Sequence, residues 1–136
     1  DALGYNEVII NTGKGHADLS AEYSSIPNEM RLVAKELGAD NLCGTDEASL
    51  LKKLPAIRAK LGNDRAIMRA LHYCEECGRV ENAAKELENG NTEEVLRMID
   101  ESGRSSWEWL QNVYCINDPK EQSISLALAV TKLYIN

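Results

Sequence analysis

The chain has 136 residues, a net charge of −7, 43% hydrophobic residues and 27% charged residues. This length allows one domain with its own core, and the composition is ordinary for a globular domain. The acidic balance argues against a broad nucleic-acid-binding face, and no apolar run reaches the length of a membrane span. We therefore expect one cytoplasmic domain over residues 1–136, with neither nucleic acid nor membrane as a partner.

One short strand is predicted near the N-terminus. Residues 6–12 form a β-branched run that ends at Gly13 and Gly15. Residues 13–16, Gly-Lys-Gly-His, are too short for a phosphate-binding loop and fit the turn after the strand. His16 follows the strand end, where functional side chains are common, but no partner residue gives it a role.

Helical periodicity predicts five or six helices after this strand. Apolar residues recur at helical spacing from Ile26 to Leu37, and Pro27 is compatible with the first turn. A second helix should open at residues 45–47, Thr-Asp-Glu, and Pro55 should divide it into two short pieces.

The longest helix is predicted over residues 64–88 and should end at Gly90. A stripe of small and apolar residues runs along it over about six turns. The stripe consists of Ile67, Ala70, Cys74, Cys77, Val80, Ala84 and Leu87. We expect its central part, Ala70 to Ala84, to be buried.

Two further helices complete the prediction. One restarts at residues 91–94 with acidic residues in its first turn, and its inward-facing residues should be Val95, Leu96 and Ile99. The last should have Asp118 as N-cap and Glu121 closing a capping box. Residues 124–133 are apolar on more than one side, so this helix should be central or should face a partner.

Cys74 and Cys77 lie one helical turn apart in the predicted long helix. A zinc site would need two more ligands, and no second pair of Cys or His has ligand spacing. A redox pair would favour a strand-to-helix junction. We expect two reduced, metal-free thiols, with a metal or redox protein as the least favoured alternative.

A polar cluster follows in residues 101–106 and contains Ser102, Ser105 and Ser106. It is similar to a nucleophile or phosphate cluster, yet no histidine or acid stands at a diagnostic spacing. The alternative is a helical segment whose hydroxyls bond to backbone carbonyls. His72, in the middle of the long helix, fits a hydrogen-bonded structural histidine. Neither feature defines a catalytic group, and the cluster's role stays open.

Several segments, in this order, resemble the C-terminal half of galactokinases, which are sugar kinases of the GHMP family. The matching segments are Asn11-Thr12 with His16, Leu19 and Glu22-Tyr23, then residues 64–72, Arg79-Val80, Glu101-Ser102 with Ser105, and residues 110–114. The last segment, Leu-Gln-Asn-Val-Tyr, fits a bacterial subgroup and departs from the family's common Asp-Asp-Tyr-Glu-Val-Ser. This departure leaves the exact sugar open.

The resemblance implies a mainly α fold, the helical part of an α+β GHMP domain with one or two short strands. It implies that the intact enzyme transfers the γ-phosphate of ATP, with Mg²⁺, to the anomeric hydroxyl of galactose. The family's galactose-contacting tyrosine corresponds to Tyr23, and no catalytic residue corresponds to any position here.

The family's phosphate loop, catalytic Asp and Arg, and glycine-rich motif do not occur in this sequence. We therefore expect an internal galactokinase fragment that is inactive alone, binds neither ATP nor Mg²⁺, and supplies one wall of the sugar site and domain packing. Surface exposed by excision should favour self-association. The alternative is a non-catalytic helical interaction or sugar-sensing module.

Overall fold

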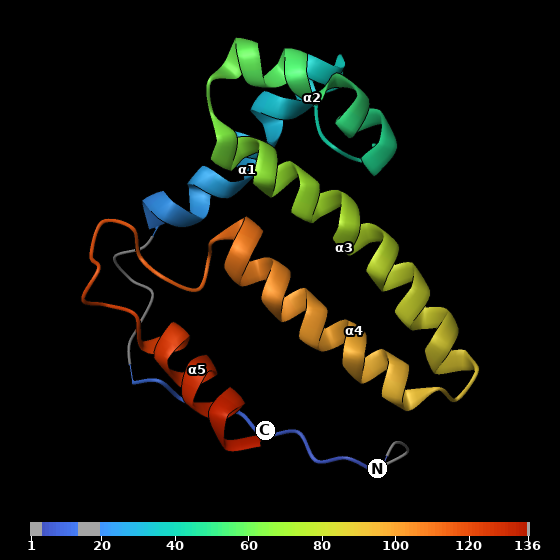
Figure 1. The fold of residues 1–136 in the computed structure, drawn as a ribbon, viewed down its shortest axis with the longest axis vertical. Coiled ribbons are helices and arrows are strands. Elements are labelled where there is room, and N and C mark those ends of the chain that lie inside the picture. Colours follow the sequence, from blue (N-terminus) through green and yellow to red (C-terminus); the bar gives the residue numbers. More distant parts are fainter. Residues whose placement is uncertain (1–3, 14–19, 136) are drawn as a thin grey trace.

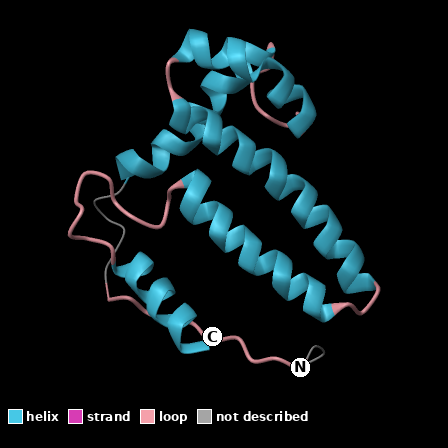
Figure 2. Ribbon diagram, viewed as in Figure 1, coloured by secondary structure: helices cyan, strands magenta, loops and turns pink. Residues whose placement is uncertain are grey.

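The computed structural model of the protein describes residues 4–13 and 20–135, and this part of the chain is mainly helical (Figures 1 and 2). The elements are α1 (Ser20–Leu37), α2 (Glu47–Leu61), α3 (Asp64–Glu88), α4 (Thr92–Ser105), a π-helix η1 (Ser106–Leu110) and α5 (Ser123–Ile135). A mainly helical fold is thus confirmed.

The predicted strand over residues 6–12 is wrong, because the described residues contain no strand. The segment is irregular, and Val8 and Ile9 are exposed. A β-branched run becomes a strand only when a neighbouring strand satisfies its backbone groups. No described segment supplies that neighbour.

Pro27 and Pro55 each lie inside a continuous helix, so two expectations are corrected. Pro27 is within α1 rather than in its first turn, because the helix already begins at Ser20. Pro55 does not divide α2. Leu50 and Ile57, on either side of Pro55, are both buried in the same core, and this packing offsets the cost of a proline in a helix.

The predicted bounds of α3 are confirmed, because its caps are local. The Asn63 side chain accepts a hydrogen bond from the Ala66 N–H at 3.0 Å. Gly62 ends α2 in a left-handed conformation, and Gly90 follows α3 in another. Both helix ends therefore depend on residues that can be read from the sequence.

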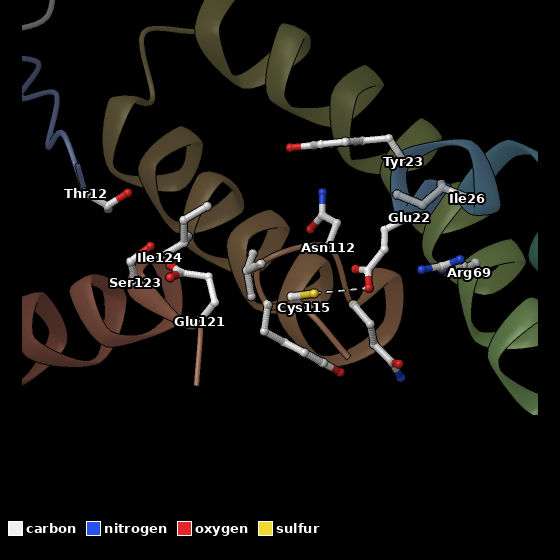
Figure 3. A pocket seen from close by; sticks show the side chains of 13 residues that line it. Thr12, Glu22, Tyr23, Ile26, Arg69, Asn112, Cys115, Glu121, Ser123 and Ile124 are labelled. Atoms are coloured by element: carbon white, nitrogen blue, oxygen red, sulfur yellow. Dashed lines mark hydrogen bonds between the residues drawn. The ribbon is translucent and has the colours of Figure 1, made fainter. Parts of the chain in front are cut away.

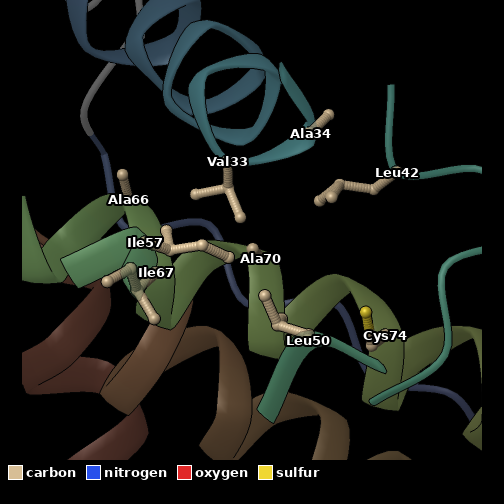
Figure 4. Close-up of a cluster of buried hydrophobic side chains, with 9 residues drawn as sticks. All are labelled: Val33, Ala34, Leu42, Leu50, Ile57, Ala66, Ile67, Ala70 and Cys74. Atoms are coloured by element: carbon tan, nitrogen blue, oxygen red, sulfur yellow. The ribbon is translucent and has the colours of Figure 1, made fainter. Parts of the chain in front are cut away.

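The apolar core lies where α1 and α2 cover the N-terminal half of α3 (Figures 1 and 4). Its buried members are Val33, Ala34, Leu42, Leu50, Ile57, Ala66, Ile67, Ala70 and Cys74. The predicted burial of the α3 stripe is therefore right for Ala70 and Cys74 and wrong further along. Cys77 and Ala84 are exposed, and Val80 is 66% exposed, because neither α1 nor α2 reaches that half.

Helix α4 packs beside α3, and the chain then continues into the wider π-helix η1 (Figure 1). Val95 is half-buried, but Leu96 and Ile99 are exposed, so two of the three residues expected to face inward do not. After η1, Gln111 has φ 57° and ψ 48° and turns the chain away from α4.

Helix α5 begins at Ser123, so the predicted cap at Asp118 is wrong. Asp118 instead closes a turn, in which its carbonyl accepts from the Glu121 N–H at 3.0 Å. Of the two alternatives for this helix, the central position is wrong, since Leu133 is 83% exposed and Leu126 is exposed too, and a face that meets a partner stays a prediction. Of the described helices, none combines the length and apolar character needed to cross a membrane.

Candidate functional site

A solvent-open pocket joins five parts of the chain (Figure 3). They are the N-terminal segment at Thr12, the start of α1, Arg69 of α3, the loop after η1, and the start of α5 with the segment before it. The lining residues are Thr12, Glu22, Tyr23, Ile26, Arg69, Gln111, Asn112, Val113, Tyr114, Cys115, Glu121, Ser123 and Ile124. The pocket is therefore a product of the tertiary fold.

Tyr23 lines this pocket, and its ring extends across it (Figure 3). The residue is 45% exposed. Its neighbour Glu22 connects α1 to the opposite loop. One Glu22 carboxylate oxygen accepts from the Asn117 amide at 3.0 Å and from the Cys115 thiol at 3.3 Å. The two walls are thus held together beside Tyr23.

A buried ionic cluster supports the wall behind the pocket. The Arg69 side chain is only 3% exposed and donates to Glu29 and to the Ser25 hydroxyl, each at 2.9 Å. Its Nε donates to the Leu110 carbonyl at 2.9 Å, and this bond fixes the end of η1 to α3. Arg65 donates to the same Glu29 carboxylate at 3.1 Å.

Opposite charges hold this cluster together, with the Glu29 carboxylate between Arg65 and Arg69. Burial lowers the pKa of Arg69, while the Glu29 carboxylate opposes that shift. A hydrogen bond to Glu29 raises the pKa of Arg65. Arginine stays protonated in proteins, so Glu29 is enclosed by two cations. This role of Arg69 was not predicted from the sequence, although an arginine among the buried residues of a helix is a signal for a paired charge.

The pocket suits a neutral polar ligand better than a polyphosphate. Glu22 and Glu121 are carboxylates, whereas Arg69, the one cation among the described lining residues, is buried and already bonded. Polyphosphates are recognised by accessible cations, backbone amides and metal ions, while sugar hydroxyls bond well to carboxylates and amides. Within the described residues, no three His, Cys, Asp or Glu side chains are grouped to hold a metal ion.

The serine cluster lies in the contact between α3 and α4, outside the pocket lining. The buried Ser105 hydroxyl is 2.9 Å from His72 Nδ1, and the Ser102 hydroxyl donates to Glu76 at 2.7 Å. The expected bonds to backbone carbonyls are thus replaced by bonds to side chains of α3. Burial lowers the pKa of His72, and nearby Arg79 adds to this effect. The bond between His72 and Ser105 thus connects α3 to α4.

Cys74 and Cys77 are not among the described residues that line the pocket. His16 lies outside the described residues. All four cysteines are free thiols; Cys74 is buried and Cys77 is exposed. Burial raises the pKa of the Cys74 thiol, which disfavours the thiolate that metal binding and redox chemistry require.

Comparison of the chain with protein-family models, with curated proteins and with solved structures finds no match.

Proposed function

We propose that this chain is part of a cytoplasmic galactokinase of the GHMP family and supplies one wall of its sugar site. The intact enzyme would transfer the γ-phosphate of ATP to the anomeric hydroxyl of galactose. Two observations support this proposal. The ordered resemblance of segments from Asn11 to Tyr114 is the first. The second, which carries the proposal, is that Tyr23 lines a pocket whose described lining suits a neutral polar ligand.

Tyr23 has the chemistry of a sugar contact and lacks that of a phosphoryl-transfer group. Its ring can cover the apolar C–H face of a pyranose, and its hydroxyl can both donate and accept a hydrogen bond. An uncharged phenol does not stabilise the charge of a migrating phosphoryl group as a cation does. Its contribution to the rate would therefore be to hold the sugar in position.

The test uses the product of the complete gene that encodes these residues. The gene should encode a phosphate loop before this segment and a glycine-rich motif after it, and its product should phosphorylate galactose with ATP. A complete gene product that binds no galactose and forms no galactose 1-phosphate would overturn the proposal. The purified 136-residue chain should show no kinase activity. Activity above a contaminant control in that chain would overturn the fragment assignment alone.

Substitution of Tyr23 tests the proposed role of the pocket. Tyr23→Ala should raise the KM for galactose about tenfold, because ring contact and hydrogen bond are both lost. The KM for ATP should change little. Tyr23→Phe keeps the ring and should have a smaller effect. Tyr5→Ala is a matched control, since Tyr5 is also partly exposed but does not line the pocket. Equal effects of Tyr23→Ala on both substrates would indicate a structural role instead.

The second candidate, a helical interaction module, shares one observation with the fragment assignment. Large apolar side chains are exposed on α5 and on the N-terminal segment. They include Val8, Ile9, Ile10, Leu126, Val130, Leu133, Tyr134 and Ile135. An apolar surface of this kind favours association. Light scattering should then show dimers or larger species of the 136-residue chain, and Leu126→Glu with Leu133→Glu should shift them toward the monomer.

A further inference from the structure

We propose that Asn112 is a second sugar-contacting residue, which lies opposite Tyr23 and recognises one hydroxyl group of the sugar. This inference rests on the proposed galactokinase function and extends it to a residue outside the tyrosine motif. Asn112 lines the same pocket, and its carboxamide projects into it toward the Tyr23 side chain (Figure 3).

The backbone that precedes Asn112 gives it this direction. In η1 the Gln111 N–H bonds to the Ser106 carbonyl at 2.9 Å, across five residues instead of four. Gln111 then adopts a left-handed conformation, the only non-glycine residue with positive φ in the described part of the chain. Such π-turns and left-handed residues are frequent at functional sites. The Arg69 bond to the Leu110 carbonyl holds this turn against α3.

The carboxamide of Asn112 is available for a ligand. Within the described residues it makes no hydrogen bond, and the residue is exposed. Glu22, on the facing wall, is already bonded to Asn117 and Cys115. A primary amide both donates and accepts, so it can satisfy one hydroxyl group in both of its roles. A pyranose between the two walls would pack against the Tyr23 ring on one side and bond to the Asn112 amide on the other.

A site built to hydrogen-bond a hydroxyl rejects an analogue without it, because its polar group is left unpaired. Loss of Asn112 should therefore remove discrimination at one position of the sugar and leave discrimination elsewhere intact. A residue that only supports the loop would weaken the binding of every sugar equally. The pattern over a series of sugars thus separates contact from support.

The experiment measures kcat and KM of the complete gene product for galactose and its 2-, 3-, 4- and 6-deoxy derivatives. Asn112→Ala should raise the KM for galactose about tenfold with the KM for ATP unchanged, in the range expected for one lost hydrogen bond. For one deoxy sugar, variant and parent should have equal kcat/KM. Asn82→Ala, which removes an exposed asparagine of α3 outside the pocket, is the matched control. If Asn112→Ala does not fold, Asn112→Ser replaces it.

Three outcomes overturn the inference and are distinguishable. Kinetics of Asn112→Ala equal to those of Asn82→Ala, with Tyr23→Ala still impaired, remove Asn112 from the site and leave the proposed function intact. An equal loss for every sugar assigns Asn112 a structural role. A parent protein that does not phosphorylate galactose ends the proposed function and this inference with it.

Discussion

Helix α3 packs differently on two of its faces. Toward α1 and α2 its first half contributes apolar side chains to a closed core, in which Val33 and Leu50 are fully buried. Toward α4 it offers polar side chains that meet in specific pairs, such as His72 with Ser105 and Glu76 with Ser102. The first contact excludes water, and the second depends on matched donors and acceptors.

This comparison indicates where the stability of the protein resides. Burial of apolar area is the main favourable contribution to folding, whereas a hydrogen bond adds little net free energy but costs much when broken in a buried place. The core of α1, α2 and α3 should therefore dominate the free energy of unfolding. The contact between α3 and α4 should determine the position of α4 and η1, and with it one wall of the pocket.

The largest expected loss of stability comes from a substitution in the closed core. Leu50→Ala should lower the free energy of unfolding by about 3 kcal/mol, because it leaves a cavity in the closed core. Val80→Ala changes a largely exposed residue on the other half of α3 and should cost less than about 0.5 kcal/mol. Urea denaturation measures both. Similar losses in the two variants would show that the second half of α3 is covered in solution.

The polar contact should appear in the pH dependence of stability. Burial lowers the pKa of His72 in the folded protein, so the unfolded chain binds the proton more readily below pH 6.5. Stability should then fall as the pH drops from 6.5 toward the lowered pKa, by at most about 1.4 kcal/mol per pH unit. His72→Gln should flatten the dependence in that window. His16→Gln, which changes the other histidine, is the control, and loss of the dependence only there would contradict the assignment.

Loss of a helix cap should lower the free energy of unfolding by a smaller amount. Asn63→Ala removes the bond to the Ala66 N–H at the start of α3 and should cost about 1 kcal/mol. Asp118→Ala affects a turn before α5 and should cost clearly less. Thermal unfolding of both variants measures the difference. A larger loss for Asp118→Ala would mean that α5 begins earlier in solution.

The last prediction concerns how fast the cysteine thiols react, and it involves no change in the stability of the protein. Cys43 and Cys77 are exposed, while Cys74 is buried with a raised thiol pKa. A thiol reagent should label Cys43 and Cys77 fast and Cys74 slowly at neutral pH, because the thiolate is the reactive form. Mass spectrometry of partly labelled protein assigns the order. Fast labelling of Cys74 would indicate that α2 opens readily from α3.

The sequence by itself determined the features that depend on neighbours along the chain. The α3 bounds follow from Asn63 and Gly90, whose side chain or conformational freedom acts within a few residues. The helical class follows from periodicity in the same way. Tyr23 was named from a resemblance in sequence; it lines the pocket, and its role as a sugar contact stays a prediction.

Only the tertiary structure decided the features that depend on distant segments. Pro55 does not break α2 because core packing on both sides of it outweighs a local preference. Residues 6–12 have strand composition but no neighbouring strand among the described residues. The second half of the α3 stripe is exposed because α1 and α2 end their coverage at Cys74. Asn112 enters the pocket through a π-turn whose end is held by Arg69, 41 residues earlier in the sequence. Such contacts are set by how the whole chain packs, and no local pattern encodes them.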